Sequence, residues 1–504
     1  MVLTWLIAIP FLGGLIAWAS ARRPGLARWV ALAACALQLL CAVTCWVEAA
    51  SSSHSGPTFL EQRAAWIPAF GVSYHLAMDG LSFLLVLLTG LLGMVAVASS
   101  WREVSSRVGA FHFSLLAVVT GVTGVFLARD LLLFYFFWEL MLVPMYFLIG
   151  LWGHERRMYA SVKFFIFTFV GSLLMLAAIL GLVFLHARAT SVLSFDLPAL
   201  LGTRLSPSAA AWLMLGFFLA FAVKLPAVPL HPWLADAHTE APTGGSVLLA
   251  GLLLKTGAYG LLRFGIPLFP QASLAFAPIA CLLGVIGILY GAVLAFAQTD
   301  LKRMVAYSSI SHMGFVLLGA YAGTELALQG AVMQIICHGV STGALFVLAG
   351  LIQERCHTRD LARLGGLWQT SPRLGGFTMF FALAALGLPG MGNFVAEFLV
   401  LLGAFQLFPV LAMVGAGGFI LSTVYALRLV QESVHGPNRG LWHLPDLSAR
   451  ELTTLGALAL IILWLGFWPR PVFRIAHPSL AQAARAVSGS VVMATGAAGP
   501  GEER

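Results

Sequence analysis

Four ionisable side chains in apolar surroundings are the residues of this chain best suited to move protons. Of its 28 basic residues, four are lysines and the remaining 24 are arginines, which lie mostly in polar segments between hydrophobic runs. Lys224 and Lys255 lie inside long apolar stretches, as do the carboxylic acids Glu139 and Glu397. A desolvated ammonium can give up its proton, whereas a guanidinium stays charged. Because ionisable groups inside membrane helices are costly and mark functional sites by default, these four predict a proton path.

The neighbours of these residues suggest how they would work. Lys224 precedes Pro226 by two residues, and Glu139 follows Trp138 and precedes Pro144. Opposite charges on neighbouring helices would hold each other ionised and would separate when a proton arrives. Lys255 has no other charge within a helical turn, so we expect it to exchange its proton most readily. The alternative for Glu139 is a carboxyl satisfied by a nearby hydroxyl.

Three histidines lie between these groups along the sequence, namely His231, His312 and His338. Histidine relays protons near neutral pH through two distinct nitrogens. Serines and a threonine close to His312 and His338 supply hydroxyl groups for such a relay, and His231 is a possible further member. The alternative, a histidine satisfied within an apolar core, stays open for each. Asp300, Lys302 and Arg303 form what we expect to be an ordinary interfacial cluster.

Composition places the chain in a membrane. It is 60% hydrophobic and only 10% charged, far from the quarter of charged residues typical of globular domains. The net charge of +8 does not indicate nucleic-acid binding, because the arginines are scattered over short loops. The six cysteines form no C-x-x-C pair, which favours core residues over metal ligands or disulfides. No phosphate-binding loop, dinucleotide fingerprint or nucleophile elbow is present, so we expect no metal or cofactor in this chain.

Hydrophobic runs long enough to cross a bilayer number about 14, which predicts an all-α polytopic membrane protein. The runs lie near 2–20, 28–48, 80–100, 111–128, 131–152, 160–186, 209–230, 243–264, 273–297, 304–322, 326–352, 374–404, 409–431 and 453–469. Their connections are short except for 49–79 and 433–451, which have room for small elements outside the membrane.

Two of these runs contain helix breaks. Residues 221–233 read FAVKLPAVPLHPW, with prolines at Pro226, Pro229 and Pro232, and residues 383–398 contain Pro389 and Gly390. Proline lacks an N–H and clashes with the preceding turn, so a helix cannot continue through it. Broken helices at membrane depth persist only when buried in protein or lining a wet cavity.

The two breaks lie five runs apart, an odd number, so the broken segments point in opposite directions. That arrangement predicts two inverted repeats of five helices, a pattern typical of transporters, at 111–264 and 273–431. Residues 1–110 would hold the first three helices and an extracytoplasmic loop near 49–79. Residues 432–504 would hold the last helix and a mobile C-terminal tail after about residue 477. Two independent proline kinks remain the alternative.

When the hydrophobic runs are numbered along the chain, the loops that follow odd-numbered runs contain 16 basic residues. The loops that follow even-numbered runs contain five. The positive-inside rule then places those loops in the cytoplasm and both termini outside it.

Several stretches together resemble a known family. FWELMLVPMYFLIG (137–150), KLPAVPLHPWLADAHTEAPTGGSVLLAGLLLKTGAYGLLRF (224–264), TDLKRMVAYSSISHMG (299–314) and LPGMGNFVAEFLV (388–400) are similar to the antiporter-like membrane subunits of respiratory complex I. The resemblance covers about residues 75–435.

The resemblance implies a proton-translocating subunit in the bacterial inner membrane, driven by NADH oxidation and quinone reduction in partner subunits. NADH, FMN, iron–sulfur clusters and quinone would belong to those partners, and neighbouring antiporter-like subunits and the lipid bilayer would surround this chain. Within the family pattern, Glu139 and Lys224 match an ion pair, and Lys255 matches a central lysine. His312 and His338 match bridging histidines, and Glu397 matches a terminal carboxylate.

Three alternatives remain at this stage. A subunit of a multisubunit cation/proton antiporter or of a membrane-bound hydrogenase would share the fold. A haem-binding membrane cytochrome would use the three histidines as axial ligands but would leave the buried lysines unexplained. A passive assembly scaffold would tolerate loss of Lys255.

Overall fold

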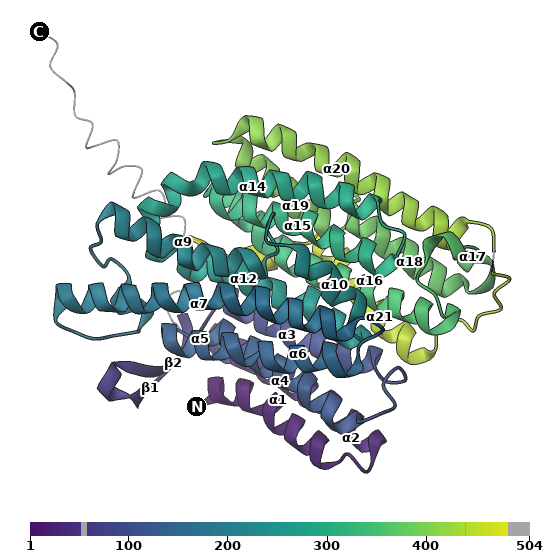
Figure 1. Ribbon diagram of the computed structural model, residues 1–504, viewed down its shortest axis with the longest axis horizontal. Helices are drawn as coiled ribbons and strands as arrows, with labels where there is room; N and C mark the ends of the chain where they lie inside the picture. Colours follow the sequence, from purple (N-terminus) through teal and green to yellow (C-terminus); the bar gives the residue numbers. More distant parts are fainter. Residues whose placement is uncertain (52–57, 439, 482–504) are drawn as a thin grey trace, which may run out of the picture.

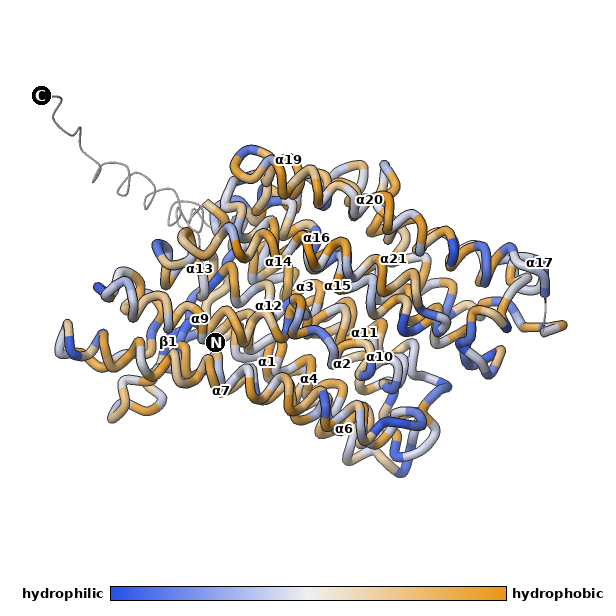
Figure 2. The backbone as a smooth tube through the Cα atoms, turned by 45° about the horizontal axis from the view of Figure 1, so that its top comes forward, coloured by the Kyte–Doolittle hydropathy of each residue, from blue (hydrophilic) through white to orange (hydrophobic). Residues whose placement is uncertain are grey.

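A computed structural model of the protein describes residues 1–51, 58–438 and 440–481. Long, roughly parallel and antiparallel helices make up most of it (Figure 1). Hydrophobic residues cover the middle of the helices, and hydrophilic residues gather toward their ends (Figure 2). Among the described residues, 13 helical segments are long and apolar enough to cross a membrane, and Gly392–Phe405 is a shorter apolar helix. Together these 14 segments correspond to the predicted runs, which confirms the polytopic helical class.

The helices of the first half lie in the purple to teal part of Figure 1. They are α1 (Val2–Ala19), α2 (Pro24–Ser51), α3 (Gly80–Ser99), α4 (Val108–Leu127), α5 (Leu131–Leu140), α6 (Leu142–Trp152), α7 (Arg157–Thr190), α8 (Leu197–Leu200), α9 (Pro207–Lys224), α10 (Pro232–Glu240), α11 (Thr243–Leu248), η2 (Leu249–Leu253), α12 (Leu254–Gly260), η3 (Leu261–Gly265) and α13 (Ile266–Leu268).

The second half continues in green and yellow. It contains α14 (Pro270–Phe296), α15 (Leu301–Ala322), α16 (Glu325–Cys356), η4 (Leu361–Arg363), α17 (Leu367–Thr370), α18 (Pro372–Ala385), α19 (Gly392–Phe405), α20 (Pro409–Leu429), η5 (Val430–His435) and α21 (Ala449–Phe467).

A β-hairpin departs from the purely helical prediction. Strands β1 (Thr58–Ile67) and β2 (Val72–Asp79) pair antiparallel around the short helix η1 (Pro68–Phe70). The hairpin occupies the long 49–79 connection, of which residues 52–57 lie outside the described part. Asp79 ends β2 and caps α3 by accepting a hydrogen bond from the Ser82 amide (3.0 Å), so the hairpin leads directly into a membrane helix.

The first predicted break separates α9 from α10. After Lys224, the Ala227 amide bonds to the Ala222 carbonyl (2.8 Å) instead of continuing the helical pattern. The Val223 carbonyl accepts the indole N–H of Trp233 (2.9 Å). A side chain thus satisfies a backbone group that the proline-rich segment leaves free at membrane depth, as such a break requires.

The second predicted break separates α18 from α19. Gly387 and Gly390 have φ of +79° and +92°, a backbone region that glycine adopts without steric cost. The hydroxyl of Ser422 donates to the Leu386 carbonyl (3.3 Å). Both breaks are therefore present where the prolines and glycines predicted them, while the inverted relation of the two repeats stays a prediction.

The polar connections lie on two opposite faces of the helix bundle. On one face, Arg28 donates to the Val104 carbonyl (3.0 Å) and Arg359 to the Thr239 carbonyl (2.5 Å). We call it the basic face. On the other, the hydroxyls of Thr4 and Tyr74 lie 3.1 Å apart beside the hairpin; we call it the hairpin face. The connections that the sequence assigned to a common side therefore do share a face.

The first residues of the predicted tail, up to residue 481, belong to a helix. Residues 470–481 are helical, and Ser479 lines a cavity together with His75 on the hairpin face. Residues 482–504 of the predicted tail lie outside the described residues. The N-terminus and the described C-terminal end therefore lie on the same face.

Candidate proton-transfer site

Lys255 lies at the centre of the protein with no solvent exposure. Its helix, α12, lies between two π-helical turns, η2 and η3, in the span Thr243–Leu268. A π-turn breaks the regular i→i−4 ladder, and such turns are frequent at functional sites. The Lys255 Nζ donates to the Ala250 carbonyl (2.7 Å), five residues earlier. The local irregularity thus gives a buried ammonium its one carbonyl partner.

His338 is the side-chain neighbour of Lys255. The Lys255 Nζ lies 2.5 Å from His338 Nδ1, and both side chains are fully buried. His338 lies on α16, 83 residues further along the chain. Its ring faces that of His312 on α15, with centroids 5.4 Å apart and planes tilted by 64°. Helices α12, α16 and α15 therefore place a lysine and two histidines next to one another in space.

His312 connects this group to Glu397. Its Nδ1 lies 2.7 Å from Glu397 Oε1, and its Nε2 lies 3.2 Å from the hydroxyl of Tyr425. The Gln334 Nε2 donates to the same Glu397 oxygen (2.7 Å). All of these side chains are at most 3% exposed. Lys255, His338, His312 and Glu397 therefore form one buried row across α12, α16, α15 and α19.

Lys224 lies next to this row but makes no direct ion pair. Its Nζ lies 5.4 Å from the ring centroid of Trp138 and 5.5 Å from that of Phe164, and no described group accepts a hydrogen bond from it. The aromatic faces supply cation–π stabilisation in place of a carboxylate. A Cβ on Gly257 would lie 3.0 Å from the Lys224 Cβ, so the glycine allows the Lys255 helix to approach α9 closely.

Glu139 differs from its predicted environment, because its side chain is only half-buried. It lines an outer groove of about 460 Å³ formed mainly by apolar side chains, including Trp66 and Phe136. Lys224 acts on it electrostatically, and the hydroxyls of Ser172 and Tyr135 are its nearest polar neighbours. Among the described side chains no salt bridge within 4.0 Å joins Glu139 and Lys224, but their charges interact, so their ion pair stays a prediction.

His231 lies outside the buried row, with its ring edge-on to Tyr290 at 5.6 Å, so its role as a possible relay stays a prediction. The prediction of an ordinary interfacial Lys302 needs correction. Lys302 is not interfacial but has no solvent exposure, and its Nζ donates to the Ala241 carbonyl (3.0 Å). The cause is that α15 begins beneath the Glu240–Thr243 turn, which covers the start of the helix.

Three polar residues near the row were missed from the sequence, namely His238, Gln334 and Tyr425. His238 stacks on Phe346 with ring centroids 4.3 Å apart, and its charge interactions reach Lys255. Gln334 precedes His338 by four residues, so helical spacing could have placed both on one face of α16. Tyr425 had no such signal, because only the packing of α20 brings it to His312.

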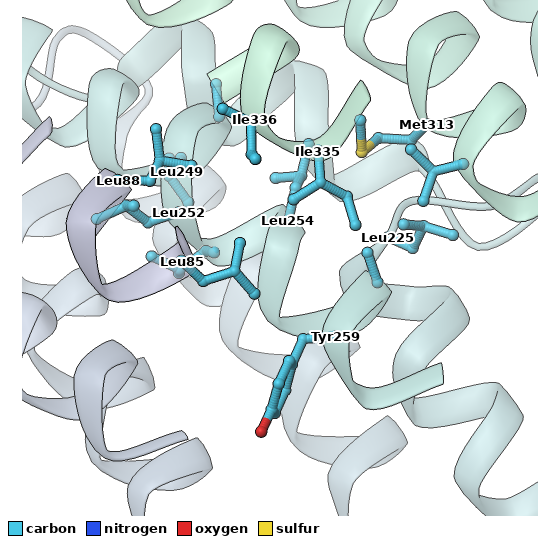
Figure 3. Close-up of a cluster of buried hydrophobic side chains, with 14 of the residues drawn as sticks. Leu85, Leu88, Leu225, Leu249, Leu252, Leu254, Tyr259, Met313, Ile335 and Ile336 are labelled. Carbon is cyan, nitrogen blue, oxygen red and sulfur yellow. The ribbon is translucent and has the colours of Figure 1, made fainter. Parts of the chain in front are cut away.

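Apolar side chains surround the row. Figure 3 shows Leu225, Leu254 and Ile335 packed together; they adjoin Lys224, Lys255 and Gln334 in the sequence. Such surroundings strengthen every electrostatic interaction and make an unpaired charge costly. A proton that enters the row is therefore held by the few groups that line it.

Charged groups cluster at the ends of the membrane helices on both faces. On the hairpin face, Asp79 bonds to Arg263 and to Arg129 (3.1 Å). Burial opposes ionisation of Asp79, yet the two guanidiniums, Arg263 foremost, hold its pKa well below the usual range. On the basic face, burial raises the pKa of Glu103, whose two oxygens accept the Thr243 amide (3.0 Å each).

The site lends itself to proton transfer more than to metal or haem binding. Among the described residues, no group of three or more His, Cys, Asp or Glu side chains is arranged to hold a metal ion. Both nitrogens of His312 already face Glu397 and Tyr425. A buried row of exchangeable groups between two broken helices is the site of an antiporter-like membrane subunit.

Comparisons with known proteins agree with that class. The family model described as NADH:quinone oxidoreductase/Mrp antiporter, TM matches residues 128–422. NADH-quinone oxidoreductase subunit M of Pseudomonas aeruginosa is 53% identical over 95% of this chain and 97% of its own length. The chain therefore belongs to the NADH-quinone oxidoreductase subunit M family, as the sequence resemblance predicted.

Solved structures are similar over the whole length. A chain of respiratory complex I from Thermus thermophilus with bound NADH superposes with a TM-score of 0.87 at 34% identity, covering 97% of this chain and 100% of the other. A chain of the Mrp complex from Dietzia sp. reaches a TM-score of 0.84 at 22% identity, covering 98% of each chain, which shows a shared fold alone.

Proposed function

We propose that this chain carries protons across the bacterial inner membrane as a membrane-arm subunit of complex I, through the buried row that starts at Lys255 and ends at Glu397. Three observations carry the proposal: Lys255 contacts His338, the rings of His338 and His312 lie 5.4 Å apart between centroids without a hydrogen bond, and His312 contacts Glu397. Each of these four groups can hold or release a proton, and each is removed from water.

Lys224 and Glu139 would control the charge of Lys255. An ammonium held only by aromatic faces responds strongly to a change of charge nearby, because low dielectric screens it little. Protonation of Glu139 would remove its attraction for Lys224 and favour movement of the Lys224 charge toward the row. A proton on Lys255 would then pass to His338 Nδ1, cross to His312 and reach Glu397.

The same proposal gives the chain its orientation. The basic face would be cytoplasmic by the positive-inside rule, and the hairpin face with both ends of the described chain would be extracytoplasmic. His231 remains a possible relay residue at the first break, although it lies outside the row.

Partner subunits would supply what this chain lacks. NADH, FMN, iron–sulfur clusters and quinone would be held by other subunits of the complex, whose redox reactions would drive the proton steps here. The half-buried Glu139 in an outer apolar groove supports a neighbouring membrane subunit at that position, because a carboxylate at membrane depth must be shielded from lipid.

The test is proton translocation per NADH oxidised in vesicles that contain the purified complex. Glu397→Gln should lower this ratio strongly while NADH oxidation with an artificial acceptor continues. Glu325→Gln, an exposed acid at the start of α16, is the matched control and should leave the ratio unchanged. An unchanged ratio in the Glu397→Gln complex would remove Glu397 from the path.

Copurification tests which multisubunit complex contains this chain. The chain should copurify with peripheral NADH-oxidising subunits; small antiporter subunits in their place would favour a multisubunit cation/proton antiporter instead. A membrane-bound hydrogenase would copurify with hydrogen-evolving subunits.

A further inference from the structure

Gln334 occupies the contact between His312 and Glu397 without being able to titrate. Its Nε2 lies 2.7 Å from Glu397 Oε1 and 3.3 Å from His312 Nδ1, so one carboxylate oxygen faces both the amide and the imidazole. Gln334 has no solvent exposure, and its Oε1 has no hydrogen-bond partner among the described protein groups.

The direction of the hydrogen bond determines what Gln334 does. An amide N–H that donates to a carboxylate favours the ionised form. A protonated Glu397 would itself need an acceptor, which the Gln334 Oε1 provides after rotation of the amide. Gln334 can therefore form a hydrogen bond with either the ionised or the protonated form of Glu397. In the structure its Nε2 donates to Glu397, which is the arrangement that suits the carboxylate.

Other groups around Glu397 do not replace this role. From α15, His312 is its exchange partner; from α20, Tyr425 bonds to His312 and not to the carboxylate. From the same helix as Gln334, the thiol of Cys337 adds only an electrostatic interaction. At the second break, a Cβ on Gly387 would lie 3.3 Å from Glu397 Oε2, so glycine keeps that side open.

We propose that Gln334 is a positioning residue that holds the Glu397 carboxyl group against His312 and so controls proton transfer between these two groups at the end of the row. The inference rests on the proposed function of Glu397. It adds a residue that never carries the proton but decides where the proton resides.

The test compares Gln334→Met with the wild-type chain in the intact complex. Methionine has a similar volume but no amide donor. Loss of this hydrogen bond should free the Glu397 carboxyl group from its position against His312. Infrared difference spectra should show this as a shift of the carboxylic-acid band that Glu397→Gln removes, and the pH profile of proton translocation should change with it.

Two further variants complete the experiment. Gln334→Glu, which replaces the donor with a second acid, should shift the band further than methionine and gives the readout if the methionine variant does not assemble. Gln329→Met alters a partly exposed glutamine on the same helix and should shift nothing.

The outcomes separate the two proposals. An unshifted band and profile in both Gln334 variants would overturn the positioning role, even if Glu397→Gln stops translocation. A shifted band in a complex whose translocation survives Glu397→Gln would support the role of Gln334 at the carboxylate and would refute Glu397 as part of the path.

Discussion

Lys255 Nζ and His338 Nδ1 lie 2.5 Å apart in the interior, so at most one of the two groups can present a proton to the other. If Lys255 is an ammonium, His338 must be neutral and accept at Nδ1. If the proton moves to His338, the amine becomes the acceptor. One contact thus links two alternative proton positions without any movement of the backbone.

Lys255→Arg should fail almost as completely as Lys255→Ala. A guanidinium cannot deprotonate at an accessible pH, and it does not fit a cavity built around one amine, the Ala250 carbonyl and an imidazole. The rate of proton translocation should fall by about tenfold or more in both variants, a barrier increase of about 1.4 kcal/mol or more. The control is assembly of the complex, checked by its subunit composition. An arginine variant that assembles and pumps near the wild-type ratio would contradict a relay role for Lys255.

Lys224→Met and Glu139→Gln should be less damaging together than the sum of their separate effects. Each single change leaves the other charge in a poorly screened position. Because aromatic rings and not a salt bridge surround the Lys224 ammonium, we expect a modest coupling of about 1 kcal/mol in the rate of proton translocation. Strict additivity would mean that the two charges act independently.

Asp79→Asn should loosen the hairpin face by stranding two buried guanidiniums. Removing one member of a buried ion pair costs about 3–5 kcal/mol, so thermal unfolding of the purified complex should begin at a lower temperature. Glu61→Gln removes a half-exposed carboxylate beside His75 on the same hairpin and should have a much smaller effect. Equal effects of the two changes would show that the Asp79 cluster adds no special stability.

The effect of Asp79→Asn should also depend on pH. The depressed pKa of Asp79 means that its stabilisation is fully present above the pKa of the unfolded carboxyl and is lost as pH falls through the folded value. The difference between wild-type and variant unfolding temperatures should therefore narrow in acid. A constant difference from neutral to strongly acidic pH would contradict an ionised Asp79.

A reporter fused after Arg359 should lie in the cytoplasm, and one fused after Arg470 should lie outside it. Arg359 belongs to the basic face, and Arg470 follows α21, which ends on the opposite face. Protease accessibility in intact and inverted vesicles measures both positions. Reporters on the same side would contradict the two-face arrangement and the predicted inversion of the repeats.

The sequence by itself determined the class, the spans and the identity of most of the row. Apolar runs of membrane length can only be helices, since every backbone group must be satisfied without water. Prolines and glycines placed both breaks correctly because their effect on the backbone is local. Lys255, His312, His338 and Glu397 stood out because charged or titratable groups are rare inside such runs.

Only the tertiary structure decided which of these groups touch. Lys255 meets His338 across 83 residues, and Gln334 meets Glu397 across 63. These contacts depend on how three helices pack and not on any local pattern. The same packing left Glu139 half-buried, gave Lys224 aromatic neighbours in place of a carboxylate and covered Lys302 completely. Burial and partner choice are properties of the surfaces that surround a side chain, and those surfaces come from segments that the sequence keeps far apart.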